Sequence, residues 1–157
     1  MTHRRLLRFI RIAAFAAALA LPSAQSFAAC RIGSVSTVAF GSYDVFSAIA
    51  DTGVGSFSVS NCSDASRAYT ASLNTGYGSY STRIMRSNGN QLQYNLYTSA
   101  SYGTVWGDHS GSTGTVSNTN ASGGGVGPTH TIYGLIPAGQ DAAVGSYTDS
   151  ITITISF

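Results

Sequence analysis

The amino-acid sequence predicts an all-β fold in which short strands pack as a sandwich. Apolar and polar residues alternate along several segments, most clearly near the C-terminus, and a period of two is that of a half-buried strand. The chain is rich in Ser, Thr, Gly and Tyr and contains neither Lys nor Glu, which favours strands and turns over helices. The one convincing apolar run of helical length, residues 12–21, lies at the N-terminus.

Residues 1–28 have the pattern of a secretory signal peptide. Four arginines lie between residues 4 and 11, the apolar run follows, and Ala28 offers a small residue at the cleavage position. The run is too short to cross a bilayer as a permanent helix. We expect cleavage after Ala28, with cleavage after Ala20 as the weaker option, and a single exported domain of residues 29–157.

Two cysteines, Cys30 and Cys62, belong to this predicted domain. An even pair in an oxidising compartment favours one disulfide bond. A metal site is the weaker alternative, because His109 and His130 do not have ligand-like spacing. Lipidation of Cys30 is another weaker alternative, because Phe27 stands where lipoproteins carry a Leu-like residue.

The predicted domain carries a small negative charge, because its four arginines face six aspartates. The residues that make the whole chain positive belong to the signal peptide. No basic patch remains, so binding to nucleic acid has no electrostatic support.

Five internal segments are predicted to be strands, and turn-forming Gly, Asn and Pro residues separate them. In the first segment the apolar residues Ile32, Val35 and Val38 recur at every third position. In the next three, apolar residues recur mainly at every second position. The segments are 31–40, 54–61, 67–74, 91–98 and 129–136.

A sixth strand is predicted for residues 145–157. Ser and Thr occupy much of one face, and the other face holds Tyr147, Ile151, Ile153, Ile155 and Phe157. No turn or further strand follows in the sequence, and an open apolar edge invites pairing with another chain. We therefore expect a neighbour from elsewhere, since six strands are one fewer than in a seven-stranded immunoglobulin-type sandwich.

Residues 99–128 form a long segment rich in Gly, Ser and Thr. It is either a surface loop or contains an extra hairpin around Val105 and Trp106. Tyr102 and Trp106 make it a candidate surface-binding loop, because aromatic rings stack on sugars or contact proteins. The adjacent Asp, His and Ser at 108–110 do not have the arrangement that usually supplies a nucleophile, a base and an orienting acid. We expect no enzymatic activity and no cofactor.

Several short motifs follow one another in a recognisable order. They occupy residues 40–44, 69–73, 83–85, 92–97, 106–108, 132–134, 136–139 and 145–149, together with the cysteine pair. No single motif is specific, but their number and order resemble the spore coat protein U domain family, which includes subunits of archaic chaperone–usher pili.

This resemblance implies an incomplete immunoglobulin-like sandwich whose last strand comes from a partner. A periplasmic chaperone would fill the open groove first, and a neighbouring pilus subunit would replace it at the outer-membrane usher. The chain would thus pass through the periplasm to the cell surface, without stable membrane insertion. The groove would lie between the first and last predicted strands and involve Ile32, Val35, Ile151, Ile153, Ile155 and Phe157.

The sequence departs from polymerising members of this family, which carry an alternating apolar donor segment before the first cysteine. Cys30 follows the predicted cleavage site almost at once, and residues 21–29 contain Pro22 and few apolar side chains. We expect a subunit that accepts a strand without donating one, at the tip or another end of a pilus. A spore or cell coat component and a carbohydrate-binding adhesin module are the alternative functions.

Overall fold

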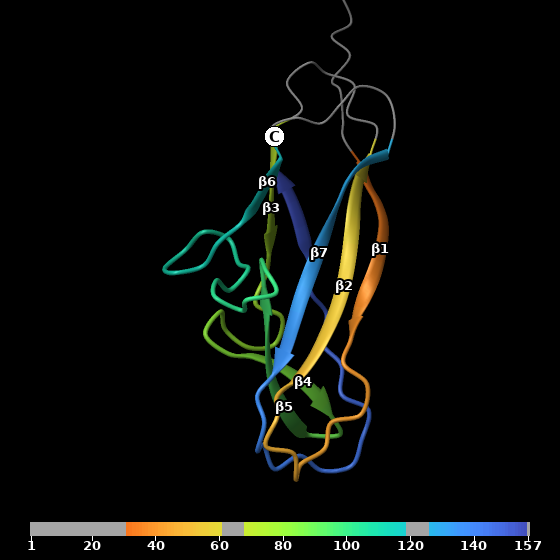
Figure 1. Ribbon diagram of the computed structural model, residues 1–157, viewed down its shortest axis with the longest axis vertical. Coiled ribbons are helices and arrows are strands. Elements are labelled where there is room, and N and C mark those ends of the chain that lie inside the picture. The colour runs from red at the N-terminus through yellow and green to blue at the C-terminus, as the bar shows by residue number, and fades with distance from the viewer. Residues whose placement is uncertain (1–30, 61–67, 119–125, 157) are drawn as a thin grey trace, which may run out of the picture.

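The structure, a computed structural model, describes residues 31–60, 68–118 and 126–156 (Figure 1). This part of the chain is all-β, and within it no helix is long and apolar enough to cross a membrane. Its strands are β1 (Arg31–Ala39), β2 (Asp51–Ser60), β3 (Tyr69–Leu73), β4 (Arg83–Ser87), β5 (Asn90–Tyr97), β6 (Val116–Asn118), β7 (Val126–Ile136) and β8 (Ile153–Ser156).

The strands form two antiparallel sheets around one core (Figure 1). The larger sheet has the order β1-β2-β7-β5-β4, and the smaller has the order β6-β3-β8. The C-terminal segment joins them, because Thr148 forms a bridge with Arg86 of β4 before the chain enters β8. The predicted all-β sandwich is therefore confirmed, with curled sheets that share the C-terminal segment.

The core is built from the alternating positions of the strands, as in β3, where Tyr69, Ala71 and Leu73 are buried. Trp106 is 0% exposed, and its ring lies 5.9 Å from that of Phe57. Its indole N–H donates a hydrogen bond of 3.0 Å to the carbonyl of Ala71. A buried indole needs such a partner, so this bond fastens the segment after β5 to β3.

Strand β1 contains two irregularities that explain its apolar residues at every third position. Its register with β2 shifts between Ile32 and Val35 and again between Ser36 and Ala39. Each shift inserts one extra residue, as a β-bulge does. Because of the extra residue, side chains three positions apart lie on the same face, as side chains two positions apart do in a regular strand. Ile32 and Val35 therefore both face the inside of the sandwich.

The strand count from the sequence needs correction. Eight strands are present in the described ranges, whereas six were predicted. The two additional strands are β4 and β6. A surface loop and an extra hairpin around Val105 and Trp106 were the two alternatives for residues 99–128. The described residues there form single bridges, Tyr97 with Val105 and Trp106 with Gly114. The last strand is shorter than predicted, because regular pairing begins only at Ile153.

Some sequence-based predictions fall outside the described residues. These are the signal peptide 1–28, the cysteines Cys30 and Cys62, and Phe157.

Candidate strand-binding groove

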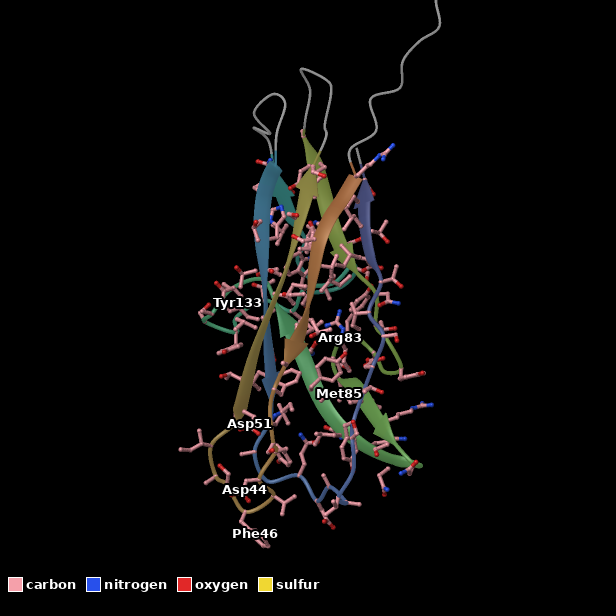
Figure 2. The ribbon with its side chains drawn as sticks, turned by 90° about the vertical axis from the view of Figure 1, so that its right-hand side faces the viewer. Asp44, Phe46, Asp51, Arg83, Met85 and Tyr133 are labelled. Atoms are coloured by element: carbon pink, nitrogen blue, oxygen red, sulfur yellow. The ribbon has the colours of Figure 1, made fainter. Side chains whose placement is uncertain are left out.

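An open groove of about 310 Å³ lies between β1 and the C-terminal segment (Figure 2). In the described part of the chain β1 pairs only with β2, and β8 only with β3, so each wall has a free backbone edge. Met85, labelled in Figure 2, lies at the base. The lining comprises Val35, Ser36, Thr37, Val38, Phe40, Met85, Tyr94, Leu96, Ile132, Tyr147, Thr148, Asp149, Ile151 and Ile153.

The β1 wall carries inward-facing apolar side chains that remain uncovered. Ile32 lies opposite Val59, and Val35 lies opposite Phe57. Directly opposed residues project from the same face of a sheet, and Val59 and Phe57 are each 0% exposed. Ile32 is nevertheless 43% exposed and Val35 58% exposed. The sandwich therefore lacks a cover at β1, although β1 directs its apolar face toward the core.

The C-terminal wall shows the same incomplete burial. Ile153 lies opposite Leu73, and Ile155 lies opposite Ala71. Leu73 and Ala71 are buried, whereas the two isoleucines are only half-buried. Ile151, which continues the series toward the bridge at Thr148, is also half-buried and packs against the core. Both walls thus present aliphatic side chains to the space between them.

Gly134 of β7 makes room for two side chains at the lower end of the groove. A Cβ atom on Gly134 would lie 2.5 Å from Phe40 Cζ and 2.7 Å from Val38 Cγ1. The absence of that atom lets the side chains of Val38 and Phe40 approach β7 closely. Phe40 then packs edge-to-face with Tyr94, with 5.9 Å between ring centroids. Val38, Phe40 and Tyr94 therefore form this end of the groove lining.

A buried polar network lies beside the floor. Arg83 is fully buried. Its Nη1 donates to Asn95 Oδ1 at 2.6 Å, and its Nη2 donates to the carbonyl of Trp106 at 2.7 Å. Burial lowers the pKa of Arg83. The Tyr94 hydroxyl donates a hydrogen bond of 2.8 Å to Asp149 Oδ2. Burial and this hydrogen bond both raise the pKa of Tyr94. The network joins β4 and β5 to the C-terminal wall.

A second cavity, of about 820 Å³, continues from the lower end of the groove. It shares Val38, Phe40, Met85 and Tyr147 with the groove lining. It extends between residues 38–46 and 142–147, near the end where Phe46 is labelled in Figure 2. An extended segment in the groove therefore has room to continue beyond it.

The structure brings together part of the predicted site. Val35, Ile151 and Ile153 line the groove, and Ile32 and Ile155 lie farther along the same two edges. Sequence reasoning missed the contributions of β5, β4 and β7. Leu96 and Ile132 belong to predicted strands and Met85 to none, and only the topology places the three under the gap.

The candidate surface-binding loop is corrected in one respect. Trp106 was a candidate for this surface-binding loop, but it is fully buried, and its indole fills the core and donates a hydrogen bond to the carbonyl of Ala71. Tyr102 is half-buried and packs edge-to-face on Tyr97, with 5.4 Å between ring centroids. The two residues therefore do not form one exposed aromatic surface.

The fold and the site define a class of protein: an all-β sandwich with an open groove between two free strand edges. A sequence profile of the Spore Coat Protein U domain matches residues 14–154. The chain therefore belongs to the Spore Coat Protein U domain family, as the order of its motifs suggested. The family is structural rather than enzymatic.

Eleven chains of solved structures are similar to this one. One of them comes from the CsuC–CsuE chaperone–tip adhesion subunit pre-assembly complex of archaic chaperone-usher Csu pili of Acinetobacter baumannii. It is 21% identical with a TM-score of 0.49, and the similarity covers 82% of this chain and 39% of that chain. No curated protein matches the chain.

Proposed function

We propose that the protein is a structural subunit of a chaperone–usher surface pilus, and that it accepts a strand from a partner in the groove. The observation that carries this proposal is the exposure of Ile32 and Val35, which face inward opposite fully buried residues. Membership of the Spore Coat Protein U domain family supports it. The partners are a periplasmic chaperone, the outer-membrane usher and a neighbouring pilus subunit.

The physical logic is that of strand addition. An extended segment between the walls would pair its backbone with β1 on one side and with the C-terminal segment on the other. It would also cover the aliphatic side chains on both walls. Completing the burial of a half-exposed Val or Ile contributes about 1 kcal/mol each. Five such residues in the described walls, Ile32, Val35, Ile151, Ile153 and Ile155, make the insertion strongly favourable.

Export and the disulfide bond belong to the same proposal. Removal of residues 1–28 would deliver the domain to the periplasm, where an oxidised cysteine pair persists. Arg31 and Ser60 are paired across β1 and β2. Arg31 directly follows Cys30, and Ser60 precedes Cys62 by two residues. A bond between the cysteines would therefore fasten β1, the uncovered wall, to the sheet.

We infer further that the subunit stands at an end of the fibre, because the predicted cleavage leaves no alternating apolar segment before Cys30. The mass of the secreted protein tests this directly. A mature N-terminus at or after residue 21 supports the terminal position, and one that retains a longer N-terminal segment removes its basis.

The proposal as a whole is tested by producing the protein in a periplasm with and without its cognate chaperone. We expect accumulation only with the chaperone, as a one-to-one complex. A stable monomer without the chaperone, which does not bind donor peptides, would show that the sandwich needs no added strand. A free-standing coat component would then be the better description.

A further inference from the structure

One position on the C-terminal wall breaks the apolar series that faces the groove. The inward-facing parity runs through Tyr147, Asp149, Ile151, Ile153 and Ile155. Asp149 is the one carboxylate among the residues that line the groove. Hydroxyl side chains such as Ser36, Thr37 and Thr148 also line the groove, but the lining holds no other charged side chain. A charged group is costly to cover unless it receives hydrogen bonds.

The position of this carboxylate is fixed by several contacts. Oδ2 accepts from the hydroxyl of Tyr94 at 2.8 Å. Oδ1 accepts from the backbone N–H of Tyr77 at 3.2 Å and of Ser150 at 2.7 Å. The carboxylate also lies against Gly76, whose φ is +60° and whose place no residue with a Cβ could take without collision. The side chain is therefore held in place before any partner arrives.

These contacts leave acceptor capacity on the carboxylate. An ionised carboxylate offers about four acceptor sites, and the three bonds above use three of them, two on Oδ1 and one on Oδ2. Asp149 is half-buried and lines the groove. A strand laid over it would exclude solvent from the remaining acceptor site, unless the strand itself supplied a donor.

We propose that Asp149 fixes the register of the inserted strand, and that the partner segment places a hydrogen-bond-donating side chain opposite it. Aliphatic side chains occupy the neighbouring inward positions of that segment, facing Val35, Ile151 and Ile153. This inference rests on the proposed function and specifies the chemistry of the partner. Candidate donor side chains are Ser, Thr, Asn and Lys.

The register argument follows from the period of a strand. A slip by two residues keeps the same side chains inward. A groove with only aliphatic walls would therefore accept several slipped registers with similar affinity. A carboxylate at one position along the groove distinguishes these registers, because in only one of them does a donor side chain of the partner lie opposite it. A single polar residue in an apolar interface sets register in coiled coils by the same physics.

The experiment uses the wild-type protein released from its chaperone complex and a set of synthetic peptides. The parent peptide is an alternating sequence of about nine residues with Leu at every inward position. In the set, Thr or Lys replaces Leu at one inward position at a time. Dissociation constants are measured by displacement of a fluorescent parent peptide. The Lys peptides are also treated with a carbodiimide, which links a Lys amine to a carboxylate in contact, and the link is mapped by mass spectrometry.

We expect one position at which Thr or Lys strengthens binding about tenfold, equivalent to about 1.4 kcal/mol. At the other inward positions both replacements weaken binding. The Lys cross-link at the favoured position maps to Asp149. In Asp149→Asn the preference for Lys over Leu shrinks, while Thr is still accepted because the amide oxygen remains an acceptor.

Weakening at every position, or a cross-link elsewhere, would overturn the assignment of Asp149 and leave strand insertion intact. Failure of every peptide to bind or to raise the melting temperature would instead overturn the proposed function. Variation of the peptide keeps the test independent of whether an Asp149 variant folds.

Discussion

Two valines on adjacent strands provide the sharpest test of strand insertion. Val35 of β1 is 58% exposed and lines the groove, and Val54 of β2 is 60% exposed. Val54 lies between Gly53 and Gly55, which are buried, so its side chain points to the outer face of the sheet. The two residues match in type and exposure and differ in the face that they present. We therefore compare Val35→Asp with Val54→Asp.

The free domain should tolerate the two changes about equally, because substitutions at exposed positions usually alter stability by no more than about 0.5 kcal/mol. The complex should not. Val35→Asp forfeits about 1 kcal/mol of valine burial under the inserted strand. It also leaves a carboxylate covered without partners, at about 1–3 kcal/mol or more. The total of about 2–4 kcal/mol corresponds to binding weaker by about 30- to 700-fold.

The assay is the dissociation constant for a donor peptide, together with the yield of chaperone complex recovered from the periplasm. Circular dichroism and the melting temperature of each free variant show that the domain is folded. Val54→Asp should bind as the wild type does. Equal losses in the two variants, or no loss in either, would refute the placement of the partner strand against the inner face of β1.

Four further predictions concern the scaffold. Trp106→Ala should lower the free energy of unfolding by about 3–5 kcal/mol in urea titrations, since it empties the core and leaves the Ala71 carbonyl without the indole; a loss below about 1 kcal/mol would contradict the burial of Trp106. Gly134→Val should cost about 1–3 kcal/mol by overpacking against Phe40 and should weaken peptide binding, whereas Gly103→Ala, where a Cβ would meet only Ser101 Oγ at 3.7 Å, should be neutral. Burial lowers the pKa of His130 below its usual 6.5, so the unfolded chain binds more protons between the lowered value and about 6.5; stability should fall as the pH drops through this window, and less so in His130→Gln, which urea titrations at pH 5 and pH 7.5 would show. Cys30 and Cys62 should resist alkylation until reduced, and reduction should cost about 2–4 kcal/mol; free thiols in the exported protein would rule out the bond.

Local pattern predicted most of the strands because each buried position recurs with the period of its strand. The alternating segments around Phe57, Tyr69 and Tyr94 lie in β2, β3 and β5. Strand β4 escaped prediction because Arg83 interrupts its apolar pattern. Nothing local indicates that a guanidinium will be buried, since the acceptors that satisfy it lie on Asn74, Asn95 and Trp106.

The candidate groove was predictable only at its walls. Ile151 and Ile153 follow from the parity of the terminal segment. The floor requires knowledge of which strands lie across the gap, and this is a property of the topology. Trp106 shows the reverse case. A tryptophan in a Gly-rich segment suggests exposure. The bridges of Val105 with Tyr97 and of Trp106 with Gly114 instead hold the segment against the domain, and the ring is fully buried.

The bulges of β1 bear on which partner can use the open edge. A flat edge strand with a regular ladder would accept the edge of a second copy, which leads to lateral aggregation. The two register shifts in β1 bend and twist that edge and interrupt a continuous ladder. A second rigid sheet cannot follow such an edge over its full length, whereas a single extended segment can adjust to it. Such a segment can also reach the C-terminal wall at the same time. The edge geometry of β1 therefore favours insertion of one strand between the two walls over side-by-side association of whole domains.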